Sequence, residues 1–240
     1  MNKKTTVIIG IVAVAIIVVA AVSYFTFTHR GEELPISTEY VDGRYNVTLS
    51  FFSGGGGQIQ YSDETGNHSE MYFESQMRTG LDWIKNETPE GAVFLCWWDY
   101  GHMIKGYAER NVVVRNPSHE WISMISEGWR SHVTEFDSNE KLVDVAKALA
   151  TSNSTEMLQM MEKYGATYVA IYKDDTPLTG KAYWIYKVAG LEPSVYIASN
   201  STSGYSNAGM ETLISRLQDN RDTSLTLVYQ DTAMKVYKKD

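Results

Sequence analysis

The longest apolar stretch of the chain lies near its N-terminus. Residues 7–25 are almost all apolar or small, and no charge appears between Lys4 and His29. A helix rises about 1.5 Å per residue, so a run of this length crosses a hydrocarbon core of about 30 Å. We therefore expect a transmembrane anchor over residues 7–28, preceded by a cytoplasmic segment of residues 1–6.

The charges that flank this run predict its orientation. Lys3 and Lys4 precede it, whereas two glutamates follow it, so the positive-inside rule places residues 31–240 outside the cytoplasm. The alternative is a cleaved signal peptide, whose apolar region is shorter, about 7 to 15 residues. We expect a single-pass protein of the cell membrane with an extracytoplasmic C-terminal domain.

Residues 31–73 are rich in Gly, Ser and Tyr, and their pattern predicts β-structure. Apolar and polar residues alternate over residues 45–51, which is the period of a half-buried strand. Four glycines at 54–57 break this strand, and residues 58–61 predict a returning one. No Gly-Lys-Ser/Thr follows these glycines, so a hairpin loop is favoured over a phosphate-binding loop. We expect a β-rich linker or hairpin here.

From residue 74 onward, helical and strand patterns alternate. Met77, Leu81 and Ile84 fall on one helical face, and the apolar run 92–98 predicts a buried strand after that helix. Further strands are expected at 111–114, 166–172, 225–229 and 234–237, the last two as a closing hairpin, and further helices at 138–149, 154–165, 180–189 and 207–218. This order predicts a single α/β domain over residues 74–240, with a mixed sheet and flanking helices.

Composition and charge exclude several classes of protein. The chain is 43% hydrophobic and 21% charged, which is typical of a globular protein. The first 30 residues hold three of the 21 basic residues and no acid, so residues 31–240 carry 18 basic against 29 acidic residues, a net charge of −11. Such a surface repels phosphate, so we expect no nucleic-acid partner. The single cysteine, Cys96, excludes an intrachain disulfide and a CxxC redox pair.

The most unusual local sequence is residues 96–102, Cys-Trp-Trp-Asp-Tyr-Gly-His. Two indole donors, a carboxylate acceptor and a glycine that permits a sharp turn are typical of a polar pocket rimmed by aromatic rings. The alternative is that both tryptophans belong to the core and Asp99 caps a helix that begins near His102. The residues alone leave both interpretations open.

The WWDYG motif at residues 97–101 resembles the signature of the catalytic subunit of oligosaccharyltransferase, the membrane enzyme that glycosylates Asn in Asn-x-Ser/Thr. The resemblance extends over about residues 74–240, and it implies a domain similar to the C-terminal extracytoplasmic domain of the archaeal subunit. The other stretches that carry it are residues 81–90, Arg110, 116–117, 161–169, 174–185, 213–217 and 225–237.

The resemblance implies that the motif grips the Ser or Thr hydroxyl two residues after the acceptor Asn. Lys181 and Ile185 fit the spacing of the family's second motif, in which either Asp174 or Asp175 supplies the acid. Ile185 would then form an apolar wall for the threonine methyl, whereas the alternative for Lys181 is a solvated helix residue. The expected acceptor-peptide site consists of Trp97, Trp98, Asp99, Tyr100, Gly101, Lys181 and Ile185.

In the family, the metal carboxylates, the lipid-linked glycan site and the catalytic acid lie in a membrane portion of many helices, whereas this chain shows one apolar span. We therefore expect no catalytic residue, no metal and no cofactor in this chain. The resemblance implies that the Mn or Mg site of the family lies in that membrane portion. The histidines lack metal-ligand spacing, and neighbours such as Ser118, His119 and Glu120 cannot form a triad.

Three functions remain open. The chain recognises sequon-containing peptides or proteins without transferring glycan alone, or it is the split subunit of an active oligosaccharyltransferase whose membrane part is another polypeptide, or it is a surface structural protein with a relic pocket. The first two imply a full-length oligosaccharyltransferase or a separate membrane subunit as partner, so whether the chain acts as an enzyme stays open. Five sequons also make the exported chain a candidate for N-glycosylation, at Asn46, Asn67, Asn86, Asn153 and Asn200.

Overall fold

A computed structural model describes residues 35–53, 56–70, 72–125 and 135–240. The chain divides into two units, and the fold below is that of the second, Ser37–Asp240. The predicted anchor at 7–28 and the cytoplasmic segment 1–6 lie outside the described residues. Within the described ranges, no helix has both the length and the apolar character needed to cross a membrane.

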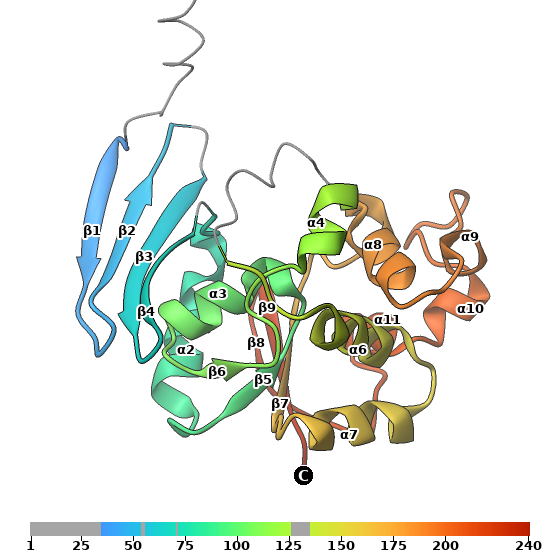
Figure 1. The fold of residues 1–240 in the computed structure, drawn as a ribbon. Coiled ribbons are helices and arrows are strands. Elements are labelled where there is room, and N and C mark those ends of the chain that lie inside the picture. Colours follow the sequence, from blue (N-terminus) through green and yellow to red (C-terminus); the bar gives the residue numbers. More distant parts are fainter. Residues whose placement is uncertain (1–34, 54–55, 71, 126–134) are drawn as a thin grey trace, which may run out of the picture. The chain divides into compact units, whose positions relative to one another are not determined.

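The β-rich segment forms an antiparallel sheet of four strands in chain order (Figure 1). These strands are β1 (Ser37–Val41), β2 (Val47–Phe51), β3 (Gly57–Asp63) and β4 (Gly66–Glu70). The predicted hairpin is its central pair, β2 and β3, in which Val47, Leu49 and Ile59 are fully buried. The pattern did not predict β1 and β4, because β1 begins with three polar residues and β4 has no apolar side chain.

A second, mixed sheet of five strands forms the centre of the α/β domain, in the order β6-β5-β7-β9-β8. β5 runs parallel to both β6 and β7, whereas β9 is antiparallel to β7 and β8. All five residues of β7 are buried, as expected for a central strand. The closing hairpin is confirmed. The strands are β5 (Val93–Leu95), β6 (Asn111–Val112), β7 (Tyr168–Tyr172), β8 (Thr226–Gln230) and β9 (Met234–Lys238).

Helices flank this sheet, so the predicted α/β class is confirmed. In Figure 1, α2 and α3 lie on the side of the small sheet, and α6, α7 and α11 lie on the other side. The helices are α2 (Arg78–Glu87), α3 (Trp98–Gly106), α4 (His119–Ile125), α6 (Asn139–Ala150), α7 (Ser154–Lys163), α8 (Lys181–Val188), α9 (Pro193–Tyr196), α10 (Asn207–Met210) and α11 (Leu213–Gln218), with 3-10 turns η1 (Ser75–Met77) and η2 (Pro177–Thr179).

The structure corrects the predicted strand at 92–98 and the helix start near His102. β5 ends at Leu95, Trp97 is an extended N-cap residue, and α3 already begins at Trp98. The apolar run continues past the strand because Cys96 and Trp97, which follow β5, are also buried in the core, and an apolar run alone does not separate a buried strand from a buried helix. Asp99 is therefore a first-turn residue of α3 and not its cap.

The predicted helix at 207–218 is two helices. Thr212 has extended backbone angles and forms the N-cap of α11, and its hydroxyl donates a 2.6 Å hydrogen bond to the carbonyl of Gly209. Other predicted boundaries are confirmed: Ser138 caps α6 by accepting a hydrogen bond from the Lys141 N–H, and Gly165 follows α7 with a φ of 64°.

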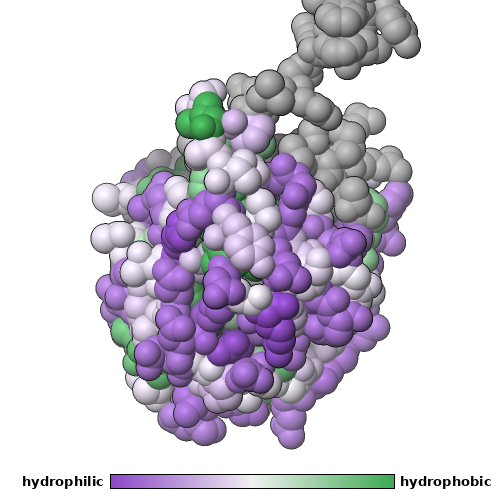
Figure 2. Space-filling model, turned by 90° about the vertical axis from the view of Figure 1, so that its left-hand side faces the viewer, coloured by the Kyte–Doolittle hydropathy of each residue, from purple (hydrophilic) through white to green (hydrophobic). Residues whose placement is uncertain are grey.

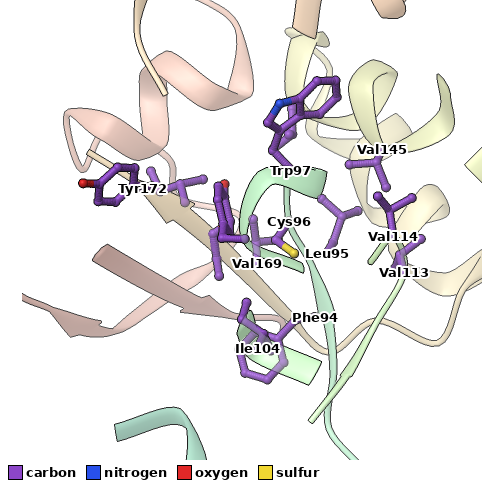
Figure 3. Packing of buried hydrophobic residues seen from close by; sticks show 14 of the residues in the cluster. Phe94, Leu95, Cys96, Trp97, Ile104, Val113, Val114, Val145, Val169 and Tyr172 are labelled. Carbon is purple, nitrogen blue, oxygen red and sulfur yellow. The ribbon is translucent and has the colours of Figure 1, made fainter. Parts of the chain in front are cut away.

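The core is continuous from the sheet into the start of α3. Figure 3 shows Phe94, Leu95 and Cys96 of the β5 region among Val113, Val169 and other buried residues. The small sheet packs on the same helix, because a Cβ at Gly106 would lie 2.4 Å from the ring of Tyr61. Figure 2 shows that the face nearest the small sheet is mostly hydrophilic, with only scattered hydrophobic side chains.

Candidate functional site

The WWDYG segment crosses from the end of β5 into the first turns of α3. Trp97 is 2% exposed and belongs to the core, whereas Trp98 is half-buried. Their rings are 6.4 Å apart at an interplanar angle of 54°. Asp99 lies in the first turn of α3, where the helix dipole stabilises a negative charge. Trp97 therefore lies in the core and Trp98 at the edge of the core, and Asp99 lies at the start of α3.

Gly101 is required by packing. A Cβ at this position would lie 2.1 Å from the carbonyl oxygen of Val114 and 3.0 Å from the Cα of Arg115. Any side chain would therefore push α3 away from the backbone that follows β6. Gly101 fixes the position of the motif and does not itself present a polar group.

Asp99 forms an ion pair with Lys181, the first residue of α8. The Lys181 Nζ lies 3.1 Å from the Asp99 Oδ2, and both side chains are largely but not fully buried. Burial raises the pKa of Asp99, and the charge of Lys181 opposes that rise. The ammonium also lies 5.1 Å from the centre of the Tyr172 ring, which adds a cation–π contact. Lys181 is therefore anchored in the site, and the alternative of a freely solvated lysine is wrong.

Asp175 connects the second motif to the first. Its fully buried carboxylate accepts a 2.5 Å hydrogen bond from the Tyr100 hydroxyl and a 3.0 Å bond from the Tyr172 N–H. Its other oxygen, Oδ1, is buried without a hydrogen-bond partner among the described groups, and burial raises the pKa of Asp175 to about 6. By contrast, Asp174 is half-buried, and its carbonyl accepts a hydrogen bond from Thr179. Asp175 is thus the acid that contacts the WWDYG motif.

The segment Tyr72 to Glu74, between β4 and η1, lies against α3 beside the motif. The Tyr72 hydroxyl donates a hydrogen bond to the Glu74 carboxylate, and the Tyr72 carbonyl lies 2.5 Å from the His102 Nε2. The Glu74 N–H points to the Met103 sulfur at 3.3 Å. Sequence reasoning missed these residues, because only the fold brings the end of the β-rich segment to the motif.

The structure divides the predicted site residues into two groups. The side chains of Trp98, Asp99 and Lys181 are partly exposed and form what we call the rim of the site. The Trp98 indole nitrogen itself is buried without a hydrogen-bond partner among the described residues. Tyr100 and Ile185 lie in the core, with exposures of 1% and 0%. The contact of Ile185 with an acceptor methyl stays a prediction.

No cluster of three or more His, Cys, Asp or Glu side chains able to hold a metal ion occurs within the described ranges. His68 instead lies in a charged network, with its Nε2 2.8 Å from Asp63 and its Nδ1 2.7 Å from Glu135. His102 is a buried residue of α3, and burial lowers its pKa to about 4.

Comparison with known proteins gives relatives of one kind, although no family model matches the sequence. Over 86 residues, 33% of this chain, it is 36% identical to a dolichyl-phosphooligosaccharide-protein glycotransferase of Methanocaldococcus jannaschii. Over 142 residues, 56% of the chain, it is 24% identical to the dolichyl-diphosphooligosaccharide–protein glycosyltransferase subunit stt3 of Schizosaccharomyces pombe. These matches span only 8% and 16% of the two relatives.

The fold has a counterpart among solved structures. The C-terminal globular domain of oligosaccharyltransferase from Archaeoglobus fulgidus matches 71% of this chain and 100% of its own length, with a TM-score of 0.51 and 21% sequence identity. The resemblance inferred from the WWDYG motif is confirmed: the homologues of this chain are catalytic subunits of oligosaccharyltransferase, and its fold is that of the C-terminal globular domain of the archaeal enzyme.

Proposed function

We propose that this chain takes part in protein N-glycosylation by recognising the Ser or Thr of Asn-x-Ser/Thr acceptor peptides. It does so as a membrane-anchored, extracytoplasmic relative of the oligosaccharyltransferase C-terminal domain and does not transfer glycan alone. The observation that carries this proposal is the Asp99–Lys181 ion pair at 3.1 Å, next in sequence to a half-buried Trp98 whose indole N–H has no partner among the described groups.

A hydroxyl suits this arrangement because it both donates and accepts. It donates to the Asp99 carboxylate, whose negative charge Lys181 stabilises against the cost of burial, and it accepts from the Trp98 indole N–H. A peptide with Ala or Val at this position leaves the Trp98 N–H without an acceptor and gives the Asp99 carboxylate no donor besides Lys181. Discrimination by unpaired polar groups is stronger than discrimination by a missing methyl group, which makes hydroxyl recognition selective.

The resemblance places the metal carboxylates and the lipid-linked glycan site of the family in a membrane portion, so glycan transfer requires that portion. The similarity to oligosaccharyltransferase subunits, over 8% and 16% of the lengths of two relatives, supports a second candidate function, a split enzyme whose membrane catalytic part is a separate polypeptide. In both cases the partners are sequon peptides and an oligosaccharyltransferase membrane subunit, and any Mn or Mg is bound by that subunit.

The test is a titration of the full-length chain in detergent micelles with peptides that differ only at the third sequon position. Asn-x-Thr and Asn-x-Ser peptides should bind about ten- to a hundredfold more tightly than Asn-x-Val, since a hydrogen bond to a charged group contributes about 1.5 to 3 kcal/mol. Thr should exceed Ser by a few-fold, because one buried methyl contributes about 0.8 kcal/mol. NMR or calorimetry at millimolar peptide gives the affinities.

Two variants separate recognition from bulk electrostatics. Asp99→Asn keeps the shape but removes the charged acceptor, so the Thr-to-Val ratio should fall towards one. Glu162→Gln removes one negative charge from an exposed position of α7 and should leave the ratio unchanged. Wild-type protein without any Thr-to-Val discrimination would support the third interpretation, a structural protein with a relic pocket. Transfer that requires a co-expressed membrane subunit would support the split enzyme.

A further inference from the structure

The fold places the five sequons of the chain in different environments, and these decide whether a folded chain can be glycosylated. Transfer to a sequon needs a free Asn amide and an accessible hydroxyl two residues later. All five Asn side chains are exposed, so exposure of the Asn alone does not distinguish them. The five sequons differ in the hydrogen bonds made by each Asn and by its Ser or Thr partner.

Helix ends constrain two of the sequons. In the Asn86 sequon, Thr88 is 5% exposed, and its hydroxyl donates to the Ile84 carbonyl at 2.6 Å. This hydroxyl, at the third position of the sequon, is therefore inaccessible to a glycosylating enzyme. Asn153 is the N-cap of α7: its Oδ1 accepts from the Thr155 N–H at 3.0 Å, and its Nδ2 donates to Glu156 at 3.3 Å. The reacting nitrogen is thus already bonded.

Strands constrain two more sequons. Thr48, of the Asn46 sequon, lies in β2 with strands paired on both sides, and Asn46 itself accepts a 3.0 Å hydrogen bond from Tyr40. Asn67 lies in β4 and accepts a 2.7 Å bond from Ser62, and the Ser69 hydroxyl accepts a 2.8 Å bond from Gln58. Both sequons would have to leave their sheet to enter an active site.

The Asn200 sequon lies at the tip of a hairpin between α9 and α10 (Figure 1). A bridge between Ile197 and Tyr205 forms its stem. Asn200 and Thr202 are both exposed. Within the described part of the chain, neither the Asn200 amide nor the Thr202 hydroxyl has a hydrogen-bond partner. This sequon combines a free amide with a free hydroxyl on a short turn, which no other sequon of the chain offers in the described structure.

We propose that Asn200 is the N-glycosylation site of the folded chain. In the active site of an oligosaccharyltransferase, the Asn200 Nδ2 forms a bond to the anomeric carbon of a lipid-linked glycan phosphate, and the bond from that carbon to the phosphate oxygen breaks. The phosphate leaves with the electron pair, and the proton lost by the amide passes to a base of that enzyme or to water. In the cell this modification rests on the exported location proposed above. The acceptor geometry itself does not depend on it.

The test uses purified full-length chain in detergent, incubated with membranes that contain an oligosaccharyltransferase and its lipid-linked oligosaccharide, followed by glycopeptide mapping by mass spectrometry. We expect a glycan at Asn200 and at none of the other four sequons. Chain digested with trypsin before the reaction should be modified at Asn153 as well, because digestion removes the fold that blocks it. Thr202→Val should abolish the Asn200 glycan, and the matched exposed variant Ser203→Ala should retain it.

Three results would overturn the proposal: an unmodified Asn200 in the folded chain, modification of another sequon in its place, or a glycan that persists in Thr202→Val. Chain isolated from its native membranes supplies a separate readout. A glycan at Asn200 there supports both the site and the export of the domain. Unmodified native chain that becomes glycosylated at Asn200 in the membrane reaction supports the acceptor geometry and contradicts the exported location.

Discussion

The Tyr100 hydroxyl donates a 2.5 Å hydrogen bond to the fully buried carboxylate of Asp175, 75 residues later in the chain. One residue before Tyr100, Asp99 pairs with Lys181, six residues after Asp175. The WWDYG motif and the second motif, residues 174–185, therefore contact each other at two places, once in the core and once at the partly exposed rim. The buried contact fixes the backbone, and the rim contact holds the groups proposed to bind the acceptor hydroxyl.

The close approach of α3 to the chain after β6 predicts a steep cost for a side chain at Gly101. Gly101→Ala would place a Cβ 2.1 Å from a backbone oxygen, which cannot move independently, so we expect a loss of about 3 kcal/mol in the free energy of unfolding. Gly91→Ala is the matched control, because a Cβ at that position would have no neighbouring atom within 4 Å, and it should change stability by less than about 0.5 kcal/mol. Urea unfolding at pH 7 measures both. Equal stabilities of the two variants would contradict the packing role.

The ion pair at the rim predicts strong coupling between its two residues. Lys181→Met leaves the Asp99 carboxylate partly buried without its cation, so the pKa of Asp99 should rise further and stability at pH 7 should fall by about 1 to 3 kcal/mol. Asp99→Asn in the same background removes the unpaired charge and should restore most of the loss. Urea unfolding of the four proteins of this double-mutant cycle gives the coupling energy. Additive single effects would show that the pair contributes nothing.

Sequence reasoning succeeded where a local pattern has a local cause. Ser138 caps α6 as predicted, because a serine before a helix satisfies a free N–H regardless of the rest of the fold. The resemblance placed Asp99 and Lys181 in one expected site, but their ion pair was not predicted. The burial of Asp175 and the position of Glu74 beside the motif were not predictable, because both arise from contacts between segments distant in the chain.

The predicted anchor and orientation have a direct test. If residues 7–28 cross the membrane with the N-terminus in the cytoplasm, external protease on spheroplasts should degrade the domain and leave a protected N-terminal fragment. An epitope tag at each end, followed by immunoblotting, distinguishes the fragments, and detergent should remove the protection. A fully protected domain would place it in the cytoplasm and would remove the basis of the proposed function.

The buried Asp175 predicts a specific pH dependence of stability. Its pKa is raised from 3.8 to about 6 in the folded chain, mainly by burial, so between these values the folded state holds a proton that the unfolded state has released. The contribution of this group to stability is therefore greatest below pH 3.8 and is lost as the pH rises to 6. A difference of about two pKa units corresponds to about 3 kcal/mol.

Asp175→Asn removes this titration while retaining an oxygen that accepts from Tyr100 and the Tyr172 N–H. The stability of the variant relative to wild type should therefore rise by about 2 to 2.5 kcal/mol between pH 4 and pH 7, whatever the difference at the lower pH. Urea unfolding at several pH values measures this change, and other titrating groups cancel because both proteins contain them. Asp174→Asn, at a half-buried neighbouring position without the Tyr100 contact, is the control and should give a much smaller change. A pH-independent difference for Asp175→Asn would mean that Asp175 stays ionised in the core, stabilised by Lys181.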